Sequence, residues 1–221
     1  MTNTSVSAST NKIRVLLVDD HAVVRVGYQM LLQNTEDIEV VSEANSGEQA
    51  CKQYVDKEPD VVVMDLSMPG IGGLEAIRRI VARDSNAKIL VFSMHESTIF
   101  VEQALQAGAR GYITKSSAPE ALIEAIRELA AGKSHIDSEI AQQLAFKKTI
   151  GQDTPFSDLS TREFEIFCLL AEGLNTSEIS KRLSLSYKTV ANYSTQIKSK
   201  LNVSTVAELA RLAIRYKIVE A

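Results

Sequence analysis

The stretch VVVMDLSMPG, residues 61–70, decides the fold. Four apolar residues run directly into a carboxylate, Asp65. A short apolar run that stops at an acid is typical of a buried parallel strand that presents a side chain at its carboxyl end. A second run, IRVLLVDD (13–20), ends in two further acids, Asp19 and Asp20. The two runs together predict neighbouring strands whose ends carry chemistry.

Length, charge and targeting signals bound the class of protein. The chain has 221 residues, enough for one large or two small domains, and 45% of them are hydrophobic. Residues 1–156 carry a net charge of −6 and residues 157–221 a net charge of +2, which indicates two parts with different partners. The polar stretch 2–11 predicts an unstructured tail and no signal peptide. No apolar run approaches the ~20 residues of a membrane span, so we expect a cytoplasmic protein without a membrane partner.

Up to about residue 131 the sequence alternates between apolar runs and stretches with helical spacing. The strand-like runs are 13–18, 38–41, 60–64, 88–93 and 110–114. The helix-like stretches are 21–33, 46–57, 73–84, 97–107 and 118–131. Five such units in a row predict an α/β domain with a five-stranded, doubly wound parallel sheet in the order 2-1-3-4-5. We place this flavodoxin-like domain at residues 12–132.

Polar residues at the strand ends form the first candidate site. In this winding the first and third strands flank the point where strand order reverses, so Asp19, Asp20 and Asp65 would converge in one crevice. Like charges this close repel unless a cation lies among them, and all-oxygen ligation suits Mg²⁺. Ser93 and Lys115 end the fourth and fifth strands and could hold the oxygens of a phosphoryl group carried on a carboxylate. Taken singly, each acid is more often a turn former or helix cap, and the set favours a functional site.

The C-terminal part has a different pattern. A short helix is expected at 137–146, and charge, Gly and Pro mix in the segment after it, so residues 133–156 are assigned as a short helix and linker. Residues 157–221 show no strand pattern and predict an all-α domain. Its four helices are expected at about 161–172, 176–183, 187–200 and 205–216. The tight turn SLS between the second and third of these is typical of a helix-turn-helix.

The third of these helices, 187–200, is the candidate DNA-contacting element. One face is apolar, and the opposite face carries Lys188, Asn192 and Thr195. A basic face with amides and hydroxyls suits the major groove of duplex DNA, although an ordinary solvated face fits this helix alone equally well. Further contacts to DNA phosphates are expected from hydroxyls, helix N-termini and lysines, at Thr176, Ser177, Thr189, Lys198 and Lys200.

Four segments of the N-terminal half carry a family signature: VLLVDDH, VVVMDLSMPGIGGLEAIRRI, ILVFSMHE and ALQAGARGYITKSS. In this order they resemble the receiver domain of two-component response regulators. The resemblance implies that Asp65 accepts a phosphoryl group from a sensor histidine kinase. It also implies that Mg²⁺ is held by Asp20 directly, by Asp19 through water, by Asp65 and by the backbone carbonyl of Ser67.

The same resemblance implies a conformational switch. Ser93 and Lys115 would contact the phosphoryl oxygens, and Tyr112 matches an aromatic switch position. Charge added at Asp65 could draw Ser93 inward and open space that Tyr112 fills from outside. The surface of the fourth helix, fifth strand and fifth helix would then rearrange.

The segment LSTREFEIFCLLAEGLNTSEISKRLSLSYKTVANYSTQIKSKLNVSTVAELARLAI resembles the LuxR/NarL-type DNA-binding domain along its whole length. The resemblance implies that the third helix reads DNA and that the fourth joins two copies. Ala191 and Tyr193 stand where a basic residue and a histidine are frequent, so base preference is not carried over, and Asn192 and Thr195 become the expected readers. The residues that would join the two copies are Val206, Leu209 and Ala213.

The sequence therefore predicts a response regulator of the NarL/FixJ type, with KTVANY and LARLAIR leaning toward the GacA/UvrY-like branch. Such a protein is a phosphorylation-controlled transcription factor that binds duplex DNA as a homodimer, and it is no enzyme beyond turnover of its own phosphoryl group. One rival is a Mg²⁺-dependent phosphatase with an Asp nucleophile, but that class needs an acid where Ser67 stands. The other rival is an RNA-binding output domain, which the tight helix-turn-helix disfavours.

Overall fold

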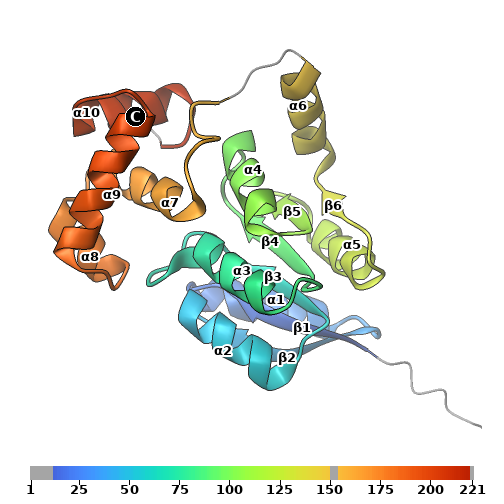
Figure 1. Ribbon diagram of the computed structural model, residues 1–221. Coiled ribbons are helices and arrows are strands. Elements are labelled where there is room, and N and C mark those ends of the chain that lie inside the picture. Colours follow the sequence, from blue (N-terminus) through green and yellow to red (C-terminus); the bar gives the residue numbers. More distant parts are fainter. Residues whose placement is uncertain (1–11, 150–153, 220–221) are drawn as a thin grey trace, which may run out of the picture.

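The computed structural model describes residues 12–149 and 154–219 of the chain (Figure 1). The expected N-terminal tail and the central part of the expected linker lie outside these residues. Within the two described segments, no helix has the length and apolar character that crossing a membrane requires.

A parallel sheet forms the centre of the N-terminal domain. Its strands are β1 (Ile13–Val18), β2 (Ile38–Ala44), β3 (Val61–Met64), β4 (Ile89–Ser93), β5 (Gly111–Thr114) and β6 (His135–Ile136). They pair in the order β2-β1-β3-β4-β5-β6, so the predicted order is confirmed and the predicted count of five strands is corrected to six. The sequence analysis misses β6 because two residues are too few for a recognisable apolar run. This strand is defined by its pairing with β5, where Tyr112 lies opposite Ile136.

Helices cover both faces of the sheet. Helices α1 (Ala22–Gln33) and α5 (Pro119–Ala130) pack on one face, and α2 (Gly47–Lys57), α3 (Gly72–Arg83) and α4 (Thr98–Ala107) pack on the other. Neighbouring side chains of β1 and β3 enter the two cores alternately, because successive residues of a strand point to opposite faces. Both faces are buried, which explains the unbroken apolar runs in the sequence.

The C-terminal domain is all-helical, as predicted. After α6 (Ser138–Thr149) come α7 (Thr161–Ala171), α8 (Thr176–Arg182), α9 (Tyr187–Lys200) and α10 (Val206–Arg215). Each of the last four helices begins at a polar residue whose side chain accepts a hydrogen bond from a first-turn backbone N–H. These caps fix where the helices start, and they are Ser160, Asn175, Ser186 and Thr205.

The two domains share one continuous apolar core through α7, which packs against α3 and α4 (Figure 1). The ring of Phe100 on α4 meets the ring of Phe164 on α7 edge to face, with centroids 5.2 Å apart. The buried side chain of Gln103, also on α4, donates from Nε2 to the carbonyl oxygen of Phe156 at 3.3 Å. Aromatic packing and a buried hydrogen bond therefore join the C-terminal part of the chain to the fourth helix of the sheet domain.

Candidate phosphoacceptor site and nucleic-acid interface

The acids at the carboxyl edge of the sheet converge as the strand order predicts. Asp19 follows β1 and Asp65 follows β3, and each is only 3% exposed. Lys115, directly after β5, reaches between them: its Nζ atom lies 2.7 Å from Asp19 Oδ2 and 2.8 Å from Asp65 Oδ2. Parallel strands end at one edge, so residues nearly 100 positions apart meet in a single pocket.

Burial and the lysine together set the charges in this pocket. Burial raises the pKa of Asp65, and the nearby ammonium group of Lys115 opposes that effect. Burial alone would lower the pKa of Lys115, but its hydrogen bonds to Asp19 and Asp65 outweigh burial and leave this pKa raised. The ammonium group therefore stays charged and compensates the two buried carboxylates.

The donor set fits a hard divalent cation. Asp19, Asp20, His21 and Asp65 each offer one possible ligand atom, and these atoms lie within 4.8 Å of one another. Asp20 Oδ1 is buried and has no hydrogen-bond partner among the described residues. His21 Nδ1 lies 2.9 Å from this oxygen, but the angles between the two groups do not allow a hydrogen bond. A buried, unpartnered carboxylate oxygen beside two other acids makes the pocket compatible with Mg²⁺.

Ser67 and Ser93 lie at the same edge, as expected. Ser67 follows Asp65 on the β3–α3 loop, and its N–H donates to Asp65 Oδ1 at 3.4 Å. Ser93 is fully buried at the end of β4, and its carbonyl oxygen accepts from the N–H of Lys115 at 2.8 Å. The ammonium group of Lys115 contacts the carboxylate that was predicted to carry the phosphoryl group, and Ser93 lies at the same edge of the sheet.

Tyr112, at the expected aromatic switch position, is fully buried in this conformation. The hydroxyl donates a hydrogen bond to the carbonyl oxygen of His95, 2.7 Å away. Burial raises the pKa of this phenol, so the hydroxyl keeps its proton and remains a donor.

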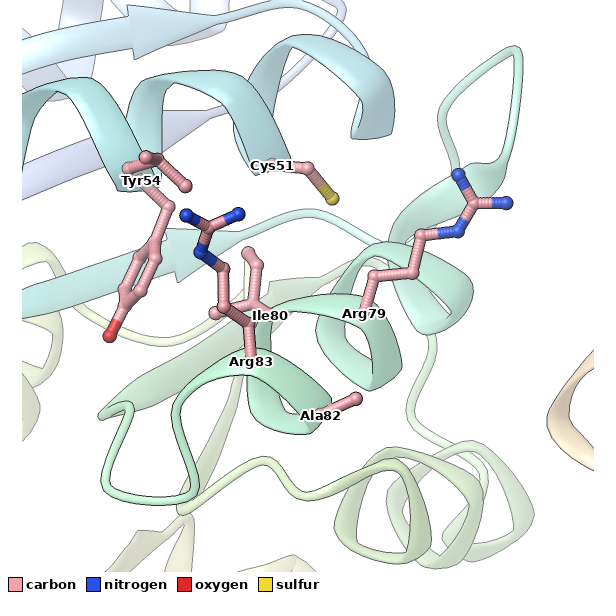
Figure 2. Close-up of a pocket in the computed structure, with 7 residues that line it drawn as sticks. Cys51, Tyr54, Arg79, Ile80, Ala82 and Arg83 are labelled. Carbon is pink, nitrogen blue, oxygen red and sulfur yellow. The ribbon is translucent and has the colours of Figure 1, made fainter.

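A hollow of about 370 Å³ between α2 and α3 lies apart from this site (Figure 2). Cys51 and Tyr54 from α2 line one side, and Arg79 and Arg83 project from α3 on the other. It contains none of the acids at the sheet edge. Burial raises the pKa of the Cys51 thiol, which disfavours a reactive thiolate there.

The candidate DNA-reading face of α9 is open in this arrangement. Lys188, Asn192 and Thr195 are all exposed. Tyr187, which the sequence analysis did not single out, is exposed on the same helix with 63% of its surface accessible. Thr195 also donates from its hydroxyl to the carbonyl oxygen of Ala191 at 3.1 Å, so it must give up this bond to donate to a base.

Three of the expected phosphate contacts are already engaged within the domain, among them Thr189, whose N–H donates to Ser186 Oγ at 3.0 Å. Lys200 Nζ donates to Glu163 Oε2 at 2.6 Å and to the carbonyl oxygen of Asp158 at 3.1 Å, so this lysine would have to leave these partners to contact a DNA phosphate. The N–H of Ser177 donates to the side chain of Asn175 at 2.9 Å, so a phosphate would have to displace this cap. Among the remaining candidates, Thr176 and Lys198 are partly exposed.

The expected dimer residues on α10 divide into two groups. Leu209 and Ala213 are fully buried in the core of their own domain, and the expectation that they contact a second copy is corrected. Helical spacing placed them on one face with Val206, but that spacing does not reveal that most of this face packs inward. Val206 and Ile214 are each 42% exposed and remain available for a partner.

Three functional candidates at the domain boundary were missed by the sequence analysis. The His95 ring stacks on Phe100 with centroids 3.7 Å apart, and its Nε2 atom lies 2.9 Å from the Ser67 hydroxyl. Arg162 and Glu165 on α7 pair with each other and lie against the β3–α3 loop. The spacing of Arg162 and Glu165 places them on one side of a helix, but nothing in the sequence says what that side faces.

Comparison with known families places this architecture in a class. The family model of the response regulator receiver domain matches residues 15–127, and that of bacterial regulatory proteins of the luxR family matches residues 157–213. The chain belongs to the two-component response regulators that join a receiver domain to a LuxR-type DNA-binding domain. The finer domain boundaries given above remain predictions.

Two response regulators with known names are similar to this chain along almost its whole length. The chain is 43% identical over 211 residues to the response regulator UvrY of Escherichia coli, covering 95% of this chain and 97% of that protein. It is equally 43% identical over 211 residues to the response regulator GacA of Pseudomonas aeruginosa, covering 95% of this chain and 99% of that one. These similarities confirm the predicted resemblance to the GacA/UvrY-like branch.

One solved structure matches the chain across both domains, and a second matches part of it. RcsB of Salmonella enterica serovar Typhimurium, bound to a promoter in the presence of a phosphomimetic, is 27% identical with a TM-score of 0.70, covering 95% of this chain and 100% of that chain. A LuxR-family response regulator from Aurantimonas is 43% identical with a TM-score of 0.61, covering 63% of this chain and 99% of that one.

Proposed function

We propose that Asp65 accepts a phosphoryl group from a sensor histidine kinase and that its phosphorylation favours binding of a homodimer to duplex DNA in the cytoplasm. The observation that carries the proposal is the placement of Lys115, whose ammonium group joins Asp19 and Asp65 at the carboxyl edge of the sheet. A buried carboxylate with a charged donor 2.8 Å away is pre-organised to hold added phosphoryl oxygens.

Phosphoryl transfer needs an attacking oxygen and compensation for its charge. An oxygen of Asp65 attacks the phosphorus of a phosphohistidine, the O–P bond forms, the P–N bond breaks and the imidazole leaves. Lys115 and Ser93 then contact the phosphoryl oxygens. Asp19, Asp20, Asp65 and the backbone carbonyl of Ser67 would hold Mg²⁺, which would supply further charge compensation. Attack of water on the same phosphorus returns the carboxylate, so turnover is confined to the protein's own phosphoryl group.

Transmission to the output domain starts at the β3–α3 loop. The N–H of Gly70, a few residues after Asp65, donates to the carbonyl oxygen of Arg182 at the end of α8, 2.9 Å away. The outer face of α9 stays exposed in this docked arrangement, so the receiver does not restrain the domain by burying that face. Instead, docking fixes the orientation of the DNA-binding domain and hinders two copies from pairing on a two-fold site.

On DNA, α9 lies in the major groove. Asn192 and Thr195 read base edges, and Val206 on α10 contacts the second copy. The phosphate contacts are carried by exposed or partly exposed lysines and by hydroxyls, at Lys188, Lys198, Thr176, Ser177 and Thr189. The RcsB structures support this geometry by likeness, because that protein has been solved as dimers on DNA, at 27% identity and a TM-score of 0.59.

Labelling with acetyl phosphate tests the phosphoacceptor. Wild-type protein with Mg²⁺ should gain one phosphoryl group per chain, and Asp65→Asn should gain none. Asp56→Asn, which makes the same change on the exposed face of α2, serves as the control and should label like the wild type. Persistent labelling of the Asp65→Asn variant would remove Asp65 from its assigned role.

A further inference from the structure

The DNA-binding domain rests on the loop that follows the phosphoacceptor. Besides the hydrogen bond from Gly70 to Arg182, Arg162 Nη1 donates to the carbonyl oxygen of Ile71 at 3.4 Å. On its other side this loop is held by α2, because the N–H of Ile71 donates to Glu48 Oε1 at 3.1 Å. The segment 70–72 is therefore fixed between the receiver and the α7–α8 surface.

Glu165 fits against this loop because residue 72 has no side chain. Gly72 has a φ of +71°, and a Cβ atom there would overlap the Glu165 carboxylate. The Glu165 side chain is 14% exposed and pairs with Arg162 on the same helix. Beside it lies a cavity of about 120 Å³ between the two domains. The carboxylate is thus enclosed at the domain boundary and faces the receiver.

Charged groups on three helices around Glu165 partly cancel. Arg162 on α7 and Arg182 on α8 attract its negative charge, and Glu75 on α3 repels it. Glu75 is itself compensated by two arginines of α3, at 2.7 Å and 2.8 Å, so its repulsion is weakened. The other titratable groups that line the shared cavity are His95, Cys168 and Glu172.

Burial sets the protonation of this acid. It raises the pKa of Glu165 from 4.5 to about 7, against the opposing effect of Arg162. The His95 ring stays neutral in the same range because burial and Lys115 lower the pKa of His95 to about 4. An acid whose pKa is higher when docked binds its proton more tightly in that state, so protonation favours docking. The contribution of the Glu165 proton to the free energy of docking is fully present at low pH and is lost as the pH rises through about 7.

We propose that Glu165 and the Gly70–Gly72 loop form a proton-sensitive latch between the receiver and the DNA-binding domain. The latch is closed when Glu165 is protonated and opens more readily when Glu165 is ionised. This inference goes beyond phosphoryl uptake at Asp65, because it concerns the docking equilibrium of the unphosphorylated chain.

The Gly70 amide offers a direct reporter of docking, because its partner, the Arg182 carbonyl, belongs to the other domain. We would record the ¹⁵N–¹H resonance of Gly70 and the radius of gyration by small-angle scattering, on the full chain without a phosphodonor. The docking constant should fall by up to about tenfold between about pH 6 and about pH 8 if receiver docking causes the whole pKa shift of Glu165. The Gly70 resonance should titrate with a midpoint near 7, and the radius of gyration should grow.

Glu165→Gln keeps the shape of the neutral acid and removes its titration. This variant should stay compact at both ends of the range, with a constant Gly70 resonance. Glu124→Gln, the same change at an exposed site on α5, should titrate like the wild type. A Glu165→Gln variant that opens with pH as the wild type does, or a wild type that shows no change, would overturn the proposal. Because no phosphodonor is present, neither result depends on Asp65.

A second pair of variants tests the steric half of the latch. Gly72→Ala should weaken docking at every pH, because its methyl group would displace the Glu165 carboxylate from its place against the loop. Gly132→Ala is the matched control: its φ is +80°, so it carries similar backbone strain, but nothing lies within 4 Å of its added Cβ atom. The latch requires Gly132→Ala to remain docked at pH 6, and a Gly72→Ala protein that docks as tightly as the wild type, with the same pH dependence, would contradict it.

Discussion

The imidazole of His95 lies flat on the ring of Phe100, with centroids 3.7 Å apart and planes inclined by 8°. His95 Nε2 is 2.9 Å from the hydroxyl of Ser67, near Asp65, while Phe100 touches Phe164 of the DNA-binding domain. Side chains in direct contact therefore run from the phosphoacceptor loop to the domain interface. Contiguous packing permits coupling between two sites, and only a measured change in coupling demonstrates it.

Replacing Phe100 by leucine removes the stack and keeps an apolar side chain. In the wild type, acetyl phosphate should raise the DNA affinity, and coupled sites typically change an affinity by about 5- to 150-fold. In the Phe100→Leu variant this increase in affinity should become much smaller. Phosphoryl uptake should persist, because Phe100 makes no contact with the acids. Fluorescence anisotropy with labelled duplex DNA measures the affinities, and Phe92→Leu, a change in the opposite core, is the control. An undiminished gain in the Phe100→Leu variant would show that the stack transmits nothing.

Lys115→Met tests the charge balance of the pocket. Removing the ammonium group leaves Asp19 and Asp65 buried without their cation, so the free energy of unfolding should fall by about 3 kcal/mol in the absence of metal. Mg²⁺ should restore much of this loss, because the cation replaces the missing positive charge. Urea unfolding with and without Mg²⁺ measures both effects, and the exposed Lys133→Met is the control. Equal losses with and without Mg²⁺ would argue against the metal site.

Lys188→Ala should weaken DNA binding through the loss of one phosphate contact. The slope of log affinity against log salt concentration should decrease in magnitude by about 1. A salt titration of DNA binding measures this slope. Lys200→Ala should leave the slope unchanged but lower the melting temperature, because Lys200 is paired with Glu163. An unchanged slope for Lys188→Ala would show that Lys188 does not contact a DNA phosphate.

Val206→Glu and Leu209→Ala separate dimer contact from core packing. Val206 is exposed, so its replacement should change stability by less than about 0.5 kcal/mol yet reduce dimerisation on DNA. Leu209 is fully buried, and truncating it should cost about 2–5 kcal/mol. Thermal unfolding gives the stabilities, and the protein concentration dependence of DNA binding gives the dimerisation. Dimerisation of Val206→Glu at wild-type strength would exclude this end of α10 from the interface.

The receiver fold could be read from the sequence because its signals are local. Apolar runs and helical spacing give the five β-α units, and the strand order brings Asp19 and Asp65 together at one edge. The reach of Lys115 between them follows from its position directly after β5. The sixth strand could not be found, since only its pairing with β5 defines it.

Burial and docking depend on tertiary contacts that no local pattern encodes. The spacing of Leu209 and Ala213 marks a helix face but not whether it meets the core or a partner. The charge of Lys200 marks a candidate phosphate contact, but its partner Glu163 lies 37 residues away in the chain. The same limit applies to Glu165, whose enclosure depends on a glycine of the other domain.

The most direct test compares the affinity of the full chain for duplex DNA before and after addition of acetyl phosphate with Mg²⁺, in wild type and Asp65→Asn. We expect the phosphodonor to tighten binding by the wild type and to leave the variant unchanged. A variant that responds as strongly as the wild type, or a wild type that does not respond, would contradict control of DNA binding by a phosphoryl group on Asp65.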